Sequence, residues 1–69
     1  MKISKLFYSR NFYNNMVLKT LEGEYRTFTI APFRTITDSD LHPIEAYPEN
    51  GDYAEEAPEY LYHLYGFER

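Results

Sequence analysis

Apolar and polar residues alternate most clearly between residues 16 and 31. The runs MVLKTL (16–21) and EYRTFTIA (24–31) are rich in β-branched, aromatic and aliphatic side chains, and Gly23 between them tolerates a positive φ. Side chains of a strand alternate between two faces, which in the second run are Phe28 with Ile30, and Tyr25 with Thr27 and Thr29. The pattern predicts a β-hairpin whose Phe28 face lies in the core.

A weaker alternation precedes the hairpin, in residues 2–8 (KISKLFY). It places Ile3 and Lys5 on one side, and Leu6 and Tyr8 on the other. We expect a third strand here, separated from the hairpin by a turn over residues 10–15, although a short helix fits the same residues nearly as well.

The alternation ends after Pro32. Residues 37–53 contain Pro43, Pro48 and several Asp, Asn, Ser and Gly residues, which favour turns. We expect an ordered but irregular loop that is anchored in the core by Leu41 and Ile44.

A helix is predicted from about Pro58 to Tyr65. Pro58 suits a first helical position, acidic residues precede it, and Gly66 suits the C-terminal cap. The predicted packing stripe consists of Leu61, Leu64 and Tyr65, and the opposite face of Glu59, Tyr62 and His63. If the helix starts earlier, Glu55 and Glu56 join that opposite face.

These elements predict an α+β fold, in which a small antiparallel sheet is packed by a short C-terminal helix. The 69 residues suffice for one domain, with a basic β-rich half (1–35) and an acidic half (36–69) made of the loop and the helix. The chain has no cysteine and no apolar run long enough to cross a bilayer, so a cytoplasmic location is expected.

Charge divides the chain more sharply than its net value of −4 suggests. Residues 1–35 carry six Lys or Arg against two Glu, a net charge of +4, and residues 36–69 carry nine Asp or Glu against Arg69, a net charge of −8. Like charges that are gathered together repel one another, so a split of this size favours an interaction surface over a merely solvated face. A solvated acidic face that keeps the protein in solution stays an alternative.

Catalytic chemistry finds little support in the sequence. There are three serines, two histidines and three isolated glycines, with neither a nucleophile elbow nor a phosphate-binding loop. Asp38, Asp40 and His42 alternate as metal ligands can, but the same residues are expected in a turn. We therefore expect no enzymatic activity, no catalytic residue, no metal and no cofactor.

Tyrosine is overused, with eight Tyr and five Phe in the chain, and it provides large and rigid contact area at interfaces. Acidic residues and tyrosines alternate through the second half, which predicts a partner-binding surface that docks on the basic groove of another protein. The predicted surface consists of Asp38, Asp40, Glu45, Glu49, Asp52, Tyr53, Glu55, Glu56, Glu59 and Tyr62.

Small size, the charge split, the excess of tyrosine and the lack of catalytic groups resemble a class of compact phage or mobile-element proteins that inhibit host defence nucleases, including DNA mimics and anti-CRISPR proteins. The resemblance implies a nuclease or another nucleic-acid-binding protein as partner, and it assigns no role to any residue. Two alternatives remain: nucleic-acid binding by the basic, aromatic first half, and self-association of the two oppositely charged halves.

Overall fold

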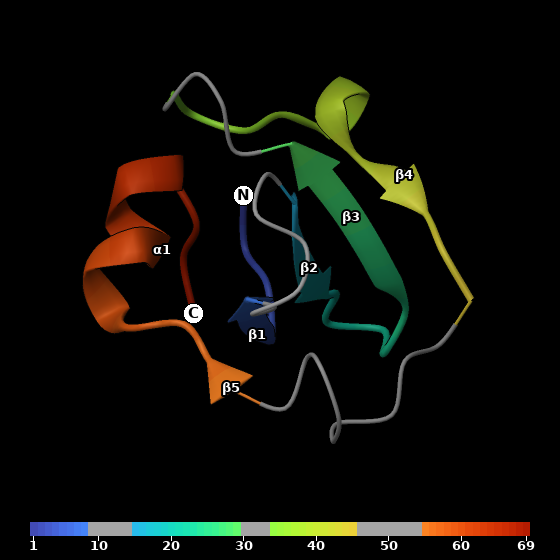
Figure 1. Cartoon of the computed structure of the whole chain (residues 1–69), viewed down its shortest axis with the longest axis horizontal. Helices are drawn as coiled ribbons and strands as arrows, with labels where there is room; N and C mark the ends of the chain where they lie inside the picture. The colour runs from blue at the N-terminus through green and yellow to red at the C-terminus, as the bar shows by residue number, and fades with distance from the viewer. Residues whose placement is uncertain (9–14, 30–33, 46–54) are drawn as a thin grey trace.

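The computed structural model describes residues 1–8, 15–29, 34–45 and 55–69 (Figure 1). These residues form a five-stranded antiparallel sheet and one C-terminal helix, which confirms the predicted α+β fold. The strands are β1 (Lys5–Tyr8), β2 (Asn15–Lys19), β3 (Tyr25–Thr29), β4 (His42–Pro43) and β5 (Glu55–Glu56), in the order β4-β3-β2-β1-β5. The helix is α1 (Glu59–Tyr65).

The predicted hairpin is formed by β2 and β3, with Val17 opposite Thr27. Gly23 has a φ of +88°, and its N–H donates a hydrogen bond of 3.0 Å to the carbonyl of Thr20. A glycine in this conformation matches the twist of the two strands. Phe28 is buried as predicted, whereas Ile30 lies outside the described residues.

The amino-terminal residues form the strand β1, not the alternative short helix. The predicted alternation is wrong at one point, because Ile3 and Leu6 are buried in the same cluster. The chain bends at Ser4, whose N–H donates to the carbonyl of Lys19, although Lys5 is the strand partner of Lys19. Ser4 and Lys5 therefore both lie opposite Lys19, as in a β-bulge. The extra residue shifts the alternation of side chains between the two faces of the sheet by one position.

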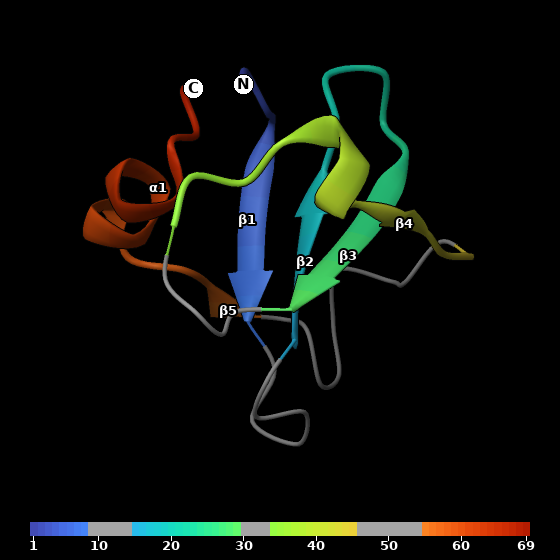
Figure 2. The same cartoon turned by 90° about the horizontal axis from the view of Figure 1, so that it is seen from above.

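Residues 34–41 cross from α1 to the far edge of the sheet, where they meet β4 (Figures 1 and 2). They contain a 3₁₀ turn, η1 (Asp38–Asp40), so the turn predicted for these aspartates is present. The predicted anchors are confirmed, but they pack on different clusters: Leu41 on the large core and Ile44 on a small cluster with Phe7 and Val17. Apolar side chains are thus buried on both faces of the sheet.

The C-terminal helix begins one residue later than predicted, since Pro58 is its N-cap, with φ −60° and ψ 155°. Gly66 is the C-cap as predicted, with φ 79°. The expectation that an earlier helix start includes Glu55 and Glu56 is wrong, because both belong to β5, which pairs with β1. A residue that precedes proline is disfavoured in the helical region, so Ala57 keeps the chain extended up to Pro58.

The predicted packing stripe of the helix is also partly wrong. Tyr62 and Tyr65 are each 1% exposed, Leu61 is half-buried, and Leu64 is 42% exposed. The predicted stripe (Leu61, Leu64 and Tyr65) and the observed one (Leu61, Tyr62 and Tyr65) both have helical spacing. Tyr62 can take the buried position because its hydroxyl finds hydrogen-bond partners inside the fold.

The large core lies between α1 and the sheet. Phe28 of β3 packs edge-on against Tyr65 and Phe67, with ring centroids 5.3 Å and 5.6 Å apart. The terminal segments close this core, since the N–H of Ile3 donates to the carbonyl of Glu68 over 2.8 Å. Within the described segments, no helix combines the length and the apolar character needed to cross a bilayer.

Candidate functional site

The ten predicted partner-binding residues do not form one patch. Glu49, Asp52 and Tyr53 lie outside the described residues. The remaining seven are spread over η1, the residues after β4, strand β5 and helix α1: Asp38, Asp40, Glu45, Glu55, Glu56, Glu59 and Tyr62. Several of these seven are engaged in contacts within the chain.

Asp40 is neutralised by an arginine of the same chain. Its two carboxylate oxygens accept hydrogen bonds of 3.0 Å and 2.5 Å from the guanidinium of Arg34, and one of them also accepts the backbone N–H of Thr37 over 2.9 Å. The Arg34 hydrogen bonds and the Thr37 N–H hold the pKa of Asp40 well below its usual range. Asp40 therefore fixes the start of η1 and adds little negative charge to an outward surface.

Tyr62 is part of the core and not of the free surface, which corrects its predicted role as an exposed contact. Its hydroxyl accepts the N–H of Leu6 over 2.8 Å and donates to Glu56 Oε2 over 2.6 Å. Burial, followed by the hydrogen bond to Glu56, raises the pKa of Tyr62 to about 12. The hydroxyl therefore stays protonated at neutral pH and can donate to Glu56.

The carboxylates of Glu56 and Glu59 both contact Arg69. Arg69 Nη2 lies 3.0 Å from Glu56 Oε2, and Nη1 lies 3.3 Å from Glu59 Oε2. Glu55 is also engaged, because it accepts a hydrogen bond of 2.9 Å from the hydroxyl of Tyr8. Three predicted contact residues thus hold β5 and α1 in place.

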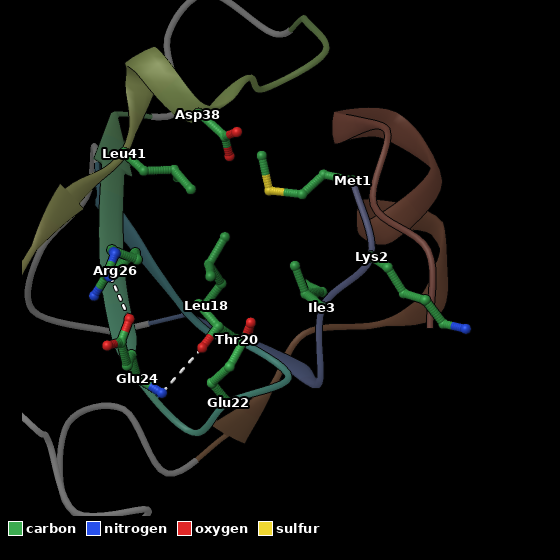
Figure 3. A pocket seen from close by; sticks show the side chains of 10 residues that line it. All are labelled: Met1, Lys2, Ile3, Leu18, Thr20, Glu22, Glu24, Arg26, Asp38 and Leu41. Carbon is green, nitrogen blue, oxygen red and sulfur yellow. Dashed lines mark hydrogen bonds and ion pairs between the residues drawn. The ribbon is translucent and has the colours of Figure 1, made fainter.

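Asp38 lies on the rim of a groove with a volume of about 490 Å³ (Figure 3). Three segments far apart in sequence form the groove: the amino-terminal residues, the end of the β2–β3 hairpin, and η1 with Leu41. The side chains of Met1, Leu41 and Asp38 point toward the space above Leu18 and Ile3 (Figure 3). The volume falls within the range of ligand pockets, roughly 300–1,000 Å³.

The groove has an apolar floor. Leu18 and Ile3 are 0% and 2% exposed, and Leu41 is half-buried beside them. The sequence places them there because Leu18 belongs to the core-facing side of β2, the bend at Ser4 turns Ile3 to the same side, and Leu41 anchors the crossing segment. Leu18 and Ile3 expose almost no surface, so an apolar side chain that enters the groove would contact mainly Leu41 and Met1 above them.

Acidic and basic side chains both line the rim of the groove. Glu24 is paired with Arg26, whereas exposed Glu22 and Asp38 have no ion-pair partner among the described residues. Lys2 also belongs to the lining, but its side chain extends away from the central space (Figure 3). The carboxylates of Glu22 and Asp38 attract positive charge, so a cation is favoured beside them at the mouth of the groove.

Glu22 and Glu24 did not emerge as site residues from the sequence, because they belong to the basic half of the chain. One signal pointed to them: Glu22-Gly23 was the predicted hairpin turn, and turns present their side chains outward. Their proximity to Asp38 depends on the path of residues 34–41 across the sheet, which no local pattern encodes.

No known protein family, no curated protein and no solved structure matches this chain. Its function is therefore inferred from the geometry and chemistry of its own residues.

Proposed function

We propose that this protein is a non-enzymatic binding module whose groove receives a basic, partly apolar segment of a partner protein. The observation that carries the proposal is the combination of an apolar floor with two rim carboxylates. In the floor, Leu41 and Met1 expose surface above the buried Ile3 and Leu18, and the rim carboxylates Glu22 and Asp38 form no ion pair with any described residue. Lysine and arginine side chains complement such a groove, because each has an apolar stem and a positively charged head.

A nuclease or another nucleic-acid-processing protein is the partner class that we propose, since basic surfaces are typical of such proteins. The support is for a local contact and not for an extended DNA-like track. Arg26, Arg34 and Arg69 pair with four of the carboxylates, Glu24, Asp40, Glu56 and Glu59. A DNA mimic needs a row of free negative charges to replace phosphates, and these pairs interrupt such a row.

Charge reversal at the rim tests the proposal. The probe is the capped tripeptide Ac-Lys-Leu-Lys-NH₂, titrated into the labelled protein and followed by NMR shifts of the Leu18, Ile3 and Leu41 methyl groups. We expect Asp38→Lys to weaken binding about tenfold or more, since losing a charge-assisted contact costs about 1.5–3 kcal/mol. Glu45→Lys is the matched control, because Glu45 is exposed, lies outside the groove and undergoes the same change of charge.

Three peptides separate the contributions to binding. Ac-Lys-Ser-Lys-NH₂ lacks the apolar residue and Ac-Glu-Leu-Glu-NH₂ lacks the positive charge, so both are expected to bind more weakly than Ac-Lys-Leu-Lys-NH₂. Equal binding of all three peptides, or equal loss in the Asp38→Lys and Glu45→Lys variants, would refute the groove as the docking site.

Nucleic-acid binding is a second candidate, and one observation favours it. Lys5 and Lys19 are direct cross-strand partners, and the Lys19 ammonium lies 5.8 Å from the centroid of the Tyr25 ring. A lysine beside an aromatic ring, with a second lysine on the neighbouring strand, can contact phosphate and base together. Retention on a heparin or single-stranded DNA column at low salt, lost when Lys5 and Lys19 are replaced by Gln, would support this candidate over the first.

A further inference from the structure

Arg69 occupies a position with three distinct partners. Its guanidinium carbon lies 4.9 Å from the centroid of the Tyr62 ring, Nη2 lies 3.0 Å from Glu56 Oε2, and Nη1 lies 3.3 Å from Glu59 Oε2. An aromatic face and two carboxylates are the partners that a planar, doubly donating cation prefers. None of these residues lines the groove beside Asp38.

Two of the three partners are held in place by contacts that do not involve Arg69. The Tyr62 hydroxyl bonds to both the N–H of Leu6 and the carboxylate of Glu56, and Glu56 belongs to β5, which pairs with Phe7 of β1. Glu59 opens α1 three residues before Tyr62, on the same side of the helix. The site would therefore keep its shape if the guanidinium left it.

Arg69 can leave without unfolding the chain. Its side chain is 43% exposed, while the preceding backbone is fixed by the buried Phe67 and by the hydrogen bond from the Glu68 N–H to the carbonyl of Met1. Rotation of one side chain would uncover the part of the Tyr62 ring that the guanidinium covers and would release the two carboxylates, which are already partly exposed. Departure of a tethered group is a local equilibrium, whose cost is small beside that of unfolding.

We propose that Tyr62, Glu56 and Glu59 form a binding site for an arginine side chain of a partner protein, and that Arg69 occupies this site in the free protein as an internal competitor. The site selects arginine over lysine because the planar guanidinium stacks on the ring while two of its N–H groups reach separate carboxylates. Because Arg69 is tethered beside the site, its effective concentration is high and it lowers the apparent affinity for a partner's arginine.

Removal of the competitor is the direct test. N-acetyl-L-argininamide is the probe, titrated into wild-type protein and the Arg69→Ala variant and followed by NMR shifts of Tyr62. We expect Arg69→Ala to bind the probe at least about tenfold more tightly than wild type, and to bind N-acetyl-L-lysinamide more weakly than the arginine probe. Arg34→Ala is the matched control, since Arg34 pairs with Asp40 and should leave probe binding at the wild-type level.

The double variant Arg69→Ala with Glu59→Gln checks that the gain arises at this site. Its affinity for the probe should fall back toward that of wild type, because one carboxylate partner is lost. Arg69→Lys, which retains a cation and most of the stem, should give an intermediate affinity and serves if Arg69→Ala does not fold. An Arg69→Ala or Arg69→Lys variant that keeps the wild-type amide spectrum but gains no affinity for argininamide would overturn the proposal.

Failure here is distinguishable from failure of the groove. The two sites use different residues, different probes and different NMR reporters, so loss of one result leaves the other standing.

Discussion

At the scale of single residues, Tyr62 shows how a polar group is accommodated in a small core. The phenol is 1% exposed, yet its oxygen has both a donor, the Leu6 N–H, and an acceptor, the Glu56 carboxylate. Next to β5, the hydroxyl completes the hydrogen bonding of β1 where the ladder ends, since the Ala57 N–H bonds to the carbonyl of the same Leu6. Burial of the ring is therefore compatible with full hydrogen bonding.

Removing that hydroxyl should destabilise the protein. In Tyr62→Phe the buried Leu6 N–H loses its acceptor, and we expect a loss of about 1–3 kcal/mol in the free energy of unfolding, measured by urea denaturation. Tyr60→Phe is the matched control, because Tyr60 is 67% exposed, and its change should stay within about 0.5 kcal/mol. Equal stability of the two variants would show that the hydrogen bond from the Leu6 N–H to the Tyr62 hydroxyl does not stabilise the fold.

At the scale of elements, Gly66 ends α1 where another part of the chain comes close. Its φ is +79°, and a Cβ built on it would lie 2.7 Å from Cγ2 of Thr35. Gly23 has a similar φ of +88° in the hairpin, but a Cβ there meets nothing within 4 Å. The two glycines therefore share a conformational requirement and differ in the space around them.

Alanine at the two positions separates these effects. Gly23→Ala should cost about 1–2 kcal/mol, the usual penalty for a left-handed residue with a Cβ. Gly66→Ala should cost more, because the contact with Thr35 is added, and thermal unfolding would measure the difference. In a Thr35→Ser background, which lacks Cγ2, the extra cost should shrink; if it does not, the close approach to Thr35 is not its cause.

The sequence predicted the elements better than it predicted their faces. The hairpin with Gly23 and the helix end at Gly66 depend on local backbone chemistry, and both were found where expected. β5 has only two residues, too few for a periodic pattern, and it is fixed by its pairing with β1. The burial of Tyr62 in place of Leu64 depends on its hydrogen-bond partners Leu6 and Glu56, which belong to β1 and β5.

The candidate site was less predictable than the fold, because it depends on tertiary arrangement. Asp38 was the one predicted contact residue, among those that the structure describes, that lines the groove. Its neighbours in the groove, Glu22 and Glu24, belong to the basic half of the chain. A count of charges along the sequence therefore assigned Asp38 and these two residues to different halves, although the fold brings them together.

At the scale of the whole molecule, the described residues of the basic and acidic halves are interleaved in one sheet and one core. The acidic half supplies β4 to the β3 edge and β5 to the β1 edge, and its Tyr62, Tyr65 and Phe67 complete the core. Arg34 pairs with Asp40 across the boundary. The described residues of the two halves therefore share one large core.

Peptides of residues 1–35 and 36–69 should accordingly be unfolded when separate. An uncovered sheet of three strands exposes its apolar face, and a seven-residue helix is too short to persist alone. Circular dichroism should show no cooperative thermal transition for either peptide, and mixing them should restore one. A cooperative transition of residues 1–35 alone would contradict the single-core description.

The outer strands of the sheet also bear on how the protein behaves in a crowded solution. β4 and β5 have two residues each; one contains Pro43, which lacks a donor N–H, and the other consists of two glutamates. Short edge strands that carry proline or like charges offer a neighbouring chain few backbone N–H and C=O groups with which to extend the sheet. The described edge strands therefore discourage copies of this protein from pairing strand to strand into fibrils, although the sheet between them contains several aromatic residues.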